Sequence, residues 1–402
     1  MSLFDRMFRT KGAGQKKAAG PRGDDFVTAL SIHLCGDPDR ALGAYLAIAE
    51  EVPGDCVAPF FAAAIQAGKG NVAEAAAKLR FLSQRIASGG EIISSAIRLE
   101  LIALVADKPV IIKIAAVAEL VASFGELLKK EGFIRESAVC LEIAAGLVPD
   151  HADVLHKLGD VLHDLRNYEY AESVLQEALK FEPSHWGALY TYAVLLQDLG
   201  RDEEAIGYYE KAVQFNPGHV NCQNNYGAAL LRTNRLEEAL AHCTLAAGLD
   251  PGSAFVKVNL GNIYLLMQEY ESARTCFAEA VSLNDRLAPA YFGLGSAEQA
   301  LQGDPERVQE LYLKAIQINP SIPEIHQALG NLLAGAGNPE ALAHFSAAAR
   351  LNNNMKNLHR DFGTACLKLG NREEGLEHLR MALQQDPDDV ALQGMLAEAQ
   401  AQ

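Results

Sequence analysis

The sequence lacks the patterns that mark disulfide-stabilised, zinc-finger or membrane-spanning proteins. Its seven cysteines are scattered, odd in number and without a C-x-x-C pair, so they indicate neither a disulfide framework nor a zinc-finger site. Isolated cysteines usually pack as small core residues, which suits a reducing compartment. The most apolar stretch, 109–128, is interrupted by Lys113, Glu119 and Glu126. No apolar run therefore reaches the roughly 18 residues of a membrane-spanning helix.

The usual catalytic motifs are also missing. The segment 68–70, Gly-Lys-Gly, has neither the upstream glycine nor the following serine or threonine of a phosphate-binding loop. No H-E-x-x-H and no G-x-S-x-G occurs anywhere in the chain. We therefore expect no catalysis by this chain alone, and no cofactor.

Positive charge is scarce. The 402 residues include 35 basic and 51 acidic residues, for a net charge of −16 at pH 7. Because nucleic-acid binders carry a basic face, we expect no nucleic-acid partner. The first 22 residues hold six basic residues against one acidic residue, a net charge of +5, so the remainder carries −21. A short basic arm thus precedes a strongly acidic body.

The sequence does contain a repeat of about 34 residues. Its clearest markers are four prolines spaced 34 residues apart, Pro149, Pro183, Pro217 and Pro251. Ten residues after each proline lies a small residue, Gly159, Ala193, Gly227 and Gly261. Each period holds two apolar-periodic stretches with the length and spacing of a helix, joined by a short polar turn. One such hairpin cannot bury its own apolar face, so neighbouring hairpins must stack into a solenoid.

This pattern resembles the tetratricopeptide repeat family, whose 34-residue helical hairpins carry small residues and a proline at these places. The segment 186–219, WGALYTYAVLLQDLGRDEEAIGYYEKAVQFNPGH, matches the family pattern well. Seven good units are recognised at 152–185, 186–219, 220–253, 254–287, 288–322, 323–355 and 356–389. An eighth, 118–151, has Ser137 in place of the usual alanine. The resemblance implies an all-α fold, a right-handed α-solenoid or superhelix of helix-turn-helix repeats.

The repeat pattern divides the sequence into four predicted segments. Residues 1–23 read as a flexible basic arm, and 24–117 as a degenerate helical region that keeps only some of the marker residues. Residues 118–389 hold eight tandem repeats, and 390–402 read as a C-terminal capping helix. Within the degenerate region, Glu91–Ala106 is predicted to form a helix, and Pro109 to start a longer one that ends near Lys130.

The resemblance also implies a binding surface, because the first helices of the hairpins line a concave groove in this family. The resemblance places the following side chains on the inward faces: His156, Asp160, His163, Asp164, Tyr190, Gln197, Asp198, Asn224, Arg232, Val258, Asn262, Leu265, Phe292, Gln299, Gln327, Asn331, Arg360, Thr364 and Lys368. Asn225 and Asn259 are predicted to belong to the same peptide-binding groove. The predicted groove changes from acidic through polar and apolar to basic, which would orient an extended ligand by charge. No lysine stands in the fifth place of any good unit, which disfavours the clamp that holds chaperone tails in some members.

Two asparagines carry a narrower resemblance. Asn225 and Asn259 occupy the sixth place of adjacent units, similar to the asparagine ladder of the repeat arm in O-linked N-acetylglucosamine transferases, which clamps peptide backbone. Only two rungs are present here, and we recognise no segment that resembles a glycosyltransferase domain in these 402 residues.

One helix face carries a set of metal-binding side chain types. His156, Asp160 and His163 follow one another at helical spacing, flanked by Asp153 and Asp164. Imidazoles and carboxylates on one face can bind zinc or a similar ion. Because one helix alone rarely completes a metal shell, the sequence favours a solvated polar face and no bound metal, with His156, Asp160 and His163 as weak candidates.

The basic arm has two alternative interpretations. Residues 1–17 combine Leu3, Phe4, Met7 and Phe8 with five basic residues. As a helix this segment would suit an anionic membrane surface or a partner groove. Its glycines instead favour a disordered tail.

These observations favour a non-enzymatic scaffold or adaptor that binds partner proteins or peptides in its groove and assembles a multiprotein complex. The alternative is an accessory or regulatory subunit that presents substrates to an enzyme such as a glycosyltransferase. A metal-dependent activity on the His156 face is a third interpretation. We expect a cytoplasmic protein, with weak peripheral contact to the inner membrane as one role of the arm. The partner, the pathway and the oligomeric state do not follow from the sequence.

Overall fold

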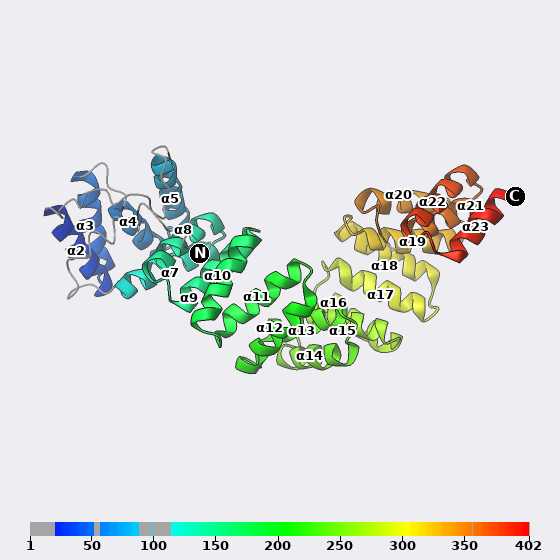
Figure 1. Cartoon of the computed structure of the whole chain (residues 1–402), viewed down its shortest axis with the longest axis horizontal. Coiled ribbons are helices and arrows are strands. Elements are labelled where there is room, and N and C mark those ends of the chain that lie inside the picture. Colours follow the sequence, from blue (N-terminus) through cyan, green and yellow to red (C-terminus); the bar gives the residue numbers. More distant parts are fainter. Residues whose placement is uncertain (1–20, 52–56, 88–96, 98–113, 356, 402) are drawn as a thin grey trace. The chain divides into compact units, whose positions relative to one another are not determined.

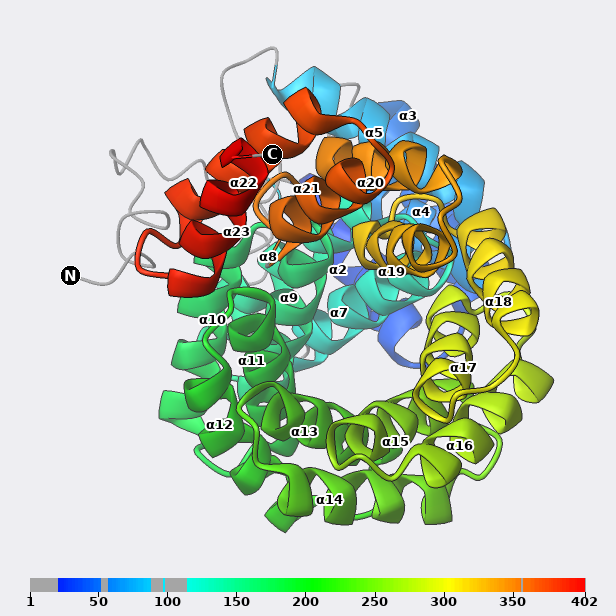
Figure 2. The ribbon, with the colours of Figure 1, turned by 90° about the vertical axis from the view of Figure 1, so that its right-hand side faces the viewer.

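A computed structural model describes residues 21–51, 57–87, 97, 114–355 and 357–401 of the chain. Every regular element in these ranges is a helix, so the predicted all-helical solenoid is confirmed. The chain divides into two compact units, residues 1–217 and 218–402. In each unit the helices follow one another in chain order as antiparallel hairpins (Figures 1 and 2). None of the helices in the described ranges combines the length and apolar character needed to cross a bilayer.

The helices of the first unit fall in both the irregular and the regular part of the repeat pattern. In the predicted degenerate region they are α2 (Pro21–Leu34), α3 (Pro38–Glu51), α4 (Val57–Gly68) and α5 (Val72–Ala87). The regular hairpins are formed by α7 (Ile114–Lys130), α8 (Ile134–Leu147), α9 (Ala152–Asp164), α10 (Tyr168–Phe181), α11 (Trp186–Asp198) and α12 (Asp202–Phe215). The predicted helix Glu91–Ala106 and the start predicted at Pro109 lie outside the described residues, apart from Ile97.

The second unit consists of five hairpins and a last single helix within its described residues. Its helices are α13 (Val220–Arg232), α14 (Leu236–Leu249), α15 (Ala254–Leu266), α16 (Tyr270–Leu283), α17 (Ala288–Ala300), α18 (Pro305–Ile318), α19 (Pro323–Gly335), α20 (Glu340–Leu351), α21 (Leu358–Lys368), α22 (Arg372–Gln385) and α23 (Val390–Ala401). The last of them, α23, lies where the sequence predicts a capping helix.

The turns between the two helices of each hairpin share one backbone conformation. In each turn, the second residue after the end of the first helix has a positive φ. At Gly200, φ is +74°, and the N–H of the next residue, Arg201, bonds to Leu196 O. This pattern satisfies carbonyls that the helix end leaves without partners. Glycine takes the left-handed conformation without steric cost. In four hairpins the same place is filled by another residue with φ between 57° and 62°, namely Arg166, Asn234, Gln268 and Gln302.

The small residues of the repeat allow close contact between helices. A β-carbon at Gly159 would lie 2.5 Å from Leu175 Cγ, so α9 and α10 touch directly at this place. In the second unit the ring of Phe277, which is fully buried in α16, lies against two glycines. A β-carbon at Gly261 of α15 or Gly293 of α17 would come within 2.6 or 2.2 Å of that ring. One aromatic ring thus packs against its own hairpin and the next one.

Aromatic packing replaces the regular alanine pattern near the start of the first unit. Phe26 of α2, Tyr45 of α3 and Phe61 of α4 are buried, with ring centroids 5.6–5.8 Å apart. Phe60 of α4 then contacts Phe124 of α7, with centroids 5.6 Å apart. These contacts connect helices α2, α3 and α4 to the regular hairpins that begin with α7. They do so although this region keeps few of the repeat markers.

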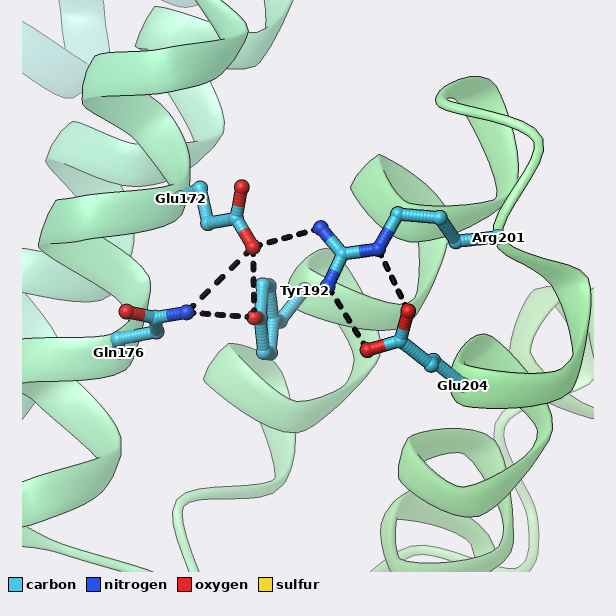
Figure 3. A network of polar contacts seen from close by, with 5 residues as sticks. All are labelled: Glu172, Gln176, Tyr192, Arg201 and Glu204. Atoms are coloured by element: carbon cyan, nitrogen blue, oxygen red, sulfur yellow. Dashed lines mark hydrogen bonds and ion pairs between the residues drawn. The ribbon is translucent and has the colours of Figure 1, made fainter.

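A polar network joins two consecutive hairpins of the first unit (Figure 3). The hydroxyl of Tyr192 in α11 donates to Glu172 of α10 at 3.0 Å and accepts from Gln176 at 2.8 Å. Arg201, at the start of α12, donates to the same Glu172 oxygen at 2.8 Å and pairs through two nitrogens with Glu204. Burial raises the pKa of Tyr192 to about 12, so the phenol stays protonated and remains a donor at neutral pH.

Candidate functional site

The basic end of the predicted groove surrounds one hollow in the second unit, which we call the C-terminal pocket. It has a volume of about 480 Å³ and lies between α19, α21 and α23. Four residues predicted from the sequence line it, Asn331, Arg360, Thr364 and Lys368. The remaining walls are Ala334, Gly335, Asp361, Ala365, Ala391 and Met395. A cationic rim thus stands beside an apolar surface of small side chains.

Internal contacts determine what the C-terminal pocket can offer a ligand. Asp361 accepts from Gln327 at 2.8 Å and from Asn331 at 3.1 Å, so both amides are held by this carboxylate. Lys368 donates to the carbonyl of Gly335 at 2.8 Å, near the C-terminus of α19. The Nε atom of Arg360 lies 3.7 Å from Asp361 Oδ1, and 41% of the Arg360 side chain is exposed. The guanidinium therefore has donors to spare for an anionic group, and the lysine can change partner.

Sequence reasoning missed two parts of this pocket. Asp361 was not singled out, although an aspartate one residue after Arg360 on a groove-facing helix could have suggested it. Ala391 and Met395 belong to α23, which the sequence predicts only as a cap, whereas in the structure this helix also forms a pocket wall.

The two predicted ladder asparagines lie in a chain of side-chain hydrogen bonds in the second unit. Asn259 of α15 donates to Asn224 of α13 at 2.9 Å, and Asn224 donates to Asn225 at 3.4 Å. Asn224 is buried, with 9% of its surface exposed. The asparagines therefore connect consecutive hairpins, and a peptide bound here would have to exchange bonds with this chain.

The other predicted groove residues differ in how much surface they present. Val258 is buried in the core around Phe277. Phe292 is half-buried and packs on Tyr312, with ring centroids 5.7 Å apart. Asn262 is half-buried. Tyr190 of the first unit is half-buried and lies near Tyr209, with centroids 6.3 Å apart.

The histidine-bearing face of α9 does not act as one group. His163 contacts Asp198 at 2.9 Å, and Asp160 contacts Lys129 at 2.5 Å. Within the described part of the chain, His156 is the one of the three weak candidates that lies in a cluster of metal-binding side chains. Its neighbours are Asp153 and, from the loop before α11, His185. The sequence did not indicate His185, because this residue ends the repeat 152–185 and does not lie on the face of α9.

Comparison with known families and structures agrees with the observed hairpins. One tetratricopeptide repeat model matches residues 261–401, and a second matches residues 156–220. A tetratricopeptide repeat protein from Parabacteroides merdae aligns with a TM-score of 0.50 at 17% identity, covering 62% of this chain and 98% of that one. This likeness shows a shared fold alone.

Two further structures align over shorter stretches. The pilF protein of Pseudomonas aeruginosa aligns with a TM-score of 0.45 and 22% identity, over 53% of this chain and 95% of that one. YrrB, described as a repeat protein with an unusual peptide-binding site, aligns with a TM-score of 0.37 and 26% identity, over 46% of this chain and 96% of that one. No curated protein matches the sequence.

Proposed function

Because the chain belongs to the tetratricopeptide repeat family, we propose that it is a non-enzymatic scaffold that holds partner proteins in a multiprotein complex. The observation that carries this proposal is the C-terminal pocket, where four side chains predicted to face a groove surround one hollow. A pocket open along a row of stacked helices suits an extended peptide segment, because such a segment can follow successive hairpins. No catalytic group is part of this proposal.

The chemistry of the pocket defines the ligand class. Arg360 and Lys368 supply cationic donors, and Ala365 and Met395 supply apolar surface. An acidic side chain flanked by a small apolar residue complements this combination. Hydrogen bonds to charged groups contribute roughly 1.5–3 kcal/mol, and about 1.4 kcal/mol corresponds to a tenfold change in affinity. We therefore propose that the partner segment is acidic.

The proposal predicts a loss of peptide binding when the cations are removed. The double variant Arg360→Ala/Lys368→Ala should bind acidic peptides at least about tenfold more weakly than the parent, as one to two charged hydrogen bonds are lost. Fluorescence anisotropy with a panel of labelled acidic peptides measures this, after capture of partners by the full chain identifies the best sequences. The matched control is Arg350→Ala/Arg380→Ala, which removes two exposed arginines outside the pocket. Equal affinity of both double variants would remove the pocket from the proposal.

The alternative function is an accessory subunit that presents substrates to an enzyme such as a glycosyltransferase. Its support is the pair Asn225 and Asn259, which would have to exchange the bonds to Asn224 for bonds to a peptide backbone. Co-purification separates the two functions. One transferase recovered in equal amount with the chain favours the accessory subunit, whereas several structural proteins favour the scaffold.

We further propose that the protein is cytoplasmic and makes weak peripheral contact with the inner membrane. The described cysteines are free thiols, four of them buried, as suits the reducing interior of the cytoplasm. Residues 1–17 lie outside the described residues, and their proposed role is weak contact with an anionic membrane. Basic groups near such a surface contribute roughly 1 kcal/mol each, while the acidic body opposes the contact.

The membrane role predicts binding that salt can reverse. The full chain should sediment with anionic vesicles at low salt, and much less at high salt or with neutral vesicles. A version that lacks residues 1–20 should not sediment under any of these conditions. If the two proteins behave alike on anionic vesicles, the arm does not contact the membrane.

A further inference from the structure

Three side chains that the proposed function does not use come together in the first unit: Asp153, His156 and His185, which we call the Asp153 cluster. A carboxylate oxygen and one nitrogen from each ring all lie within 4.8 Å of one another. We infer that the Asp153 cluster binds a divalent transition metal ion of the zinc type, and that the ion links two consecutive hairpins. This inference does not depend on the proposed scaffold function.

The fold supplies the ligand that a single helix lacks. Asp153 and His156 lie one turn apart in α9, so their side chains share a face. His185 is the residue before α11 and therefore belongs to the entry of the next hairpin. Its ring centroid lies 5.2 Å from that of His156, and its Nε2 lies 3.8 Å from Asp153 Oδ1. An ion bound here would contact both hairpins at once.

The surroundings of His156 fit a metal ligand. Its Nε2 is 3.1 Å from Thr191 Oγ1. In the tautomer that donates this N–H to the threonine, the other ring nitrogen, Nδ1, carries the lone pair. Metal-binding histidines usually make such a second hydrogen bond, which fixes the ring and its tautomer. The backbone at Gly187 leaves room for the ring, because a β-carbon there would lie 2.7 Å from His156 Cε1.

His185 has to change its proton position to bind an ion. Its Nδ1 accepts from the N–H of Ala188 at 3.1 Å, so the neutral ring carries its proton on Nε2. Binding through Nε2 moves the ring proton to Nδ1, and Ala188 then exchanges its bond with His185 for one with water. The equivalent residue of the following repeat, His219, makes the same bond to the N–H of Cys222, and among the described residues it belongs to no such cluster. The cap and the ligand role can therefore be tested separately.

The carboxylates beside the cluster favour a cation. A hollow of about 470 Å³ opens beside it and is lined by three carboxylates, Asp150, Asp153 and Glu182, with no lysine or arginine among its walls. The second oxygen of Asp153, Oδ2, pairs with Lys157 at 2.9 Å, so Oδ1, which faces His185, is the oxygen that an ion would bind.

The geometry needs only small side-chain movements. Zinc bonds of about 2.0–2.1 Å in a tetrahedral shell place neighbouring ligand atoms roughly 3.3 Å apart. The ligand atoms lie within 4.8 Å of one another, so rotations that move each side-chain tip by about 1 Å bring them to this spacing. Two imidazoles and one carboxylate leave a fourth position for water.

Zinc titration of the full chain tests the inference. Protein is stripped with a chelator, dialysed and titrated with Zn²⁺ in competition with a chromophoric indicator. The parent should bind one ion, and the melting temperature should rise with added Zn²⁺. His156→Asn, His185→Asn and Asp153→Asn should each weaken binding at least about tenfold. Asparagine at 185 keeps a good helix cap, so its loss of binding would report the ligand and not the fold.

Two matched controls decide the outcome. His163→Asn removes the other histidine of α9, which contacts Asp198. His219→Asn removes the capping histidine that ends the following repeat, at the place equivalent to His185. Both should bind Zn²⁺ as the parent does, with circular dichroism confirming that every variant is folded in chelator. The inference is overturned if the three cluster variants bind as tightly as the controls, if His163→Asn is the variant that loses the ion, or if the parent binds no ion.

Discussion

Leucine in place of Gly261 or Gly293 is expected to destabilise the second unit by about 1–3 kcal/mol or more. Even a β-carbon at either position would lie within 2.6 Å of the Phe277 ring, and leucine adds three further carbons. The ring is fully buried and cannot move into solvent without opening the contact between hairpins. Gly227→Leu should act similarly, because a β-carbon there would lie 2.3 Å from Cys243 Sγ. Urea unfolding followed by circular dichroism measures the loss.

The control for these variants is Gly248→Ala in α14, where a β-carbon would meet no atom within 4 Å. Alanine should stabilise this helix by about 0.5–1 kcal/mol, because glycine is the poorer helix former. Phe277→Ala combined with Gly261→Leu should recover part of the loss, as the added side chain then fills the vacated space. Unchanged unfolding of both Gly261→Leu and Gly293→Leu would contradict the described packing.

A fall in stability between pH 7 and pH 5 is the second large effect expected in this unit. Two histidine pairs contribute to it, His326 with His344 and His359 with His378, whose Nδ1 atoms are 3.2 and 3.0 Å apart. Burial also lowers the pKa of His219 and His242 in this unit, which adds to the effect in both the parent and the variants. The ring centroids of the two pairs are 5.5 and 5.2 Å apart. In each pair the centroid distance exceeds the Nδ1–Nδ1 distance by about the width of one ring. The two nitrogens of each pair therefore point at one another and share one proton.

The second ring nitrogen limits how many protons each pair can take. Nε2 of His326 contacts Pro320 O, and Nε2 of His359 contacts Asn353 O, both at 3.1 Å. Each of these Nε2 atoms must carry a proton, since a carbonyl only accepts. The partner, His344 or His378, can gain a proton on its own Nε2 and keep the shared bond. A second added proton would place two N–H groups and two positive charges face to face.

The sign of the pH effect follows from the pKa shifts. Burial lowers the pKa of His344, His359 and His378, while Glu340 opposes this at His344, and Glu374 and Glu377 oppose it at His378. The unfolded chain, with imidazole pKa values near 6.5, therefore binds more protons as the pH falls. The stability present above that pH is lost on acidification, by at most about 1.4 kcal/mol per pH unit for each titrating ring.

Urea unfolding at pH 7.5, 6.0 and 5.0 measures this dependence. The variant His344→Gln/His378→Gln should show a flatter profile than the parent, since it cannot place two imidazolium ions together. His151→Gln, which removes an exposed histidine outside both pairs, should keep the parent slope. Parallel profiles for the double variant and the parent would show that the pairs do not titrate in this range.

The hairpins could be predicted from sequence because each depends on local spacing. The proline and glycine periods indicate where α11 and α12 begin and end, and the unit 186–219 coincides with them closely. The pairing of side chains depends on the next hairpin and on rotamers, which a single sequence does not reveal. Asp361 holding Gln327 and Asn331 is one such case, and His185 joining His156 is another. The irregular packing around Phe61 also escaped prediction, because its aromatic contacts follow no fixed period.

The stability of the chain can still be raised at the turn positions where a non-glycine residue has the left-handed conformation. A non-glycine residue in this conformation costs roughly 1–2 kcal/mol, and the hairpin turns at Arg166, Gln268 and Gln302 each keep such a residue. Glycine at these places would remove the steric cost but widen the unfolded ensemble, so only part of it would be recovered. The three turns are therefore independent positions at which the solenoid can be strengthened to offset destabilising changes elsewhere, including changes in the binding pocket.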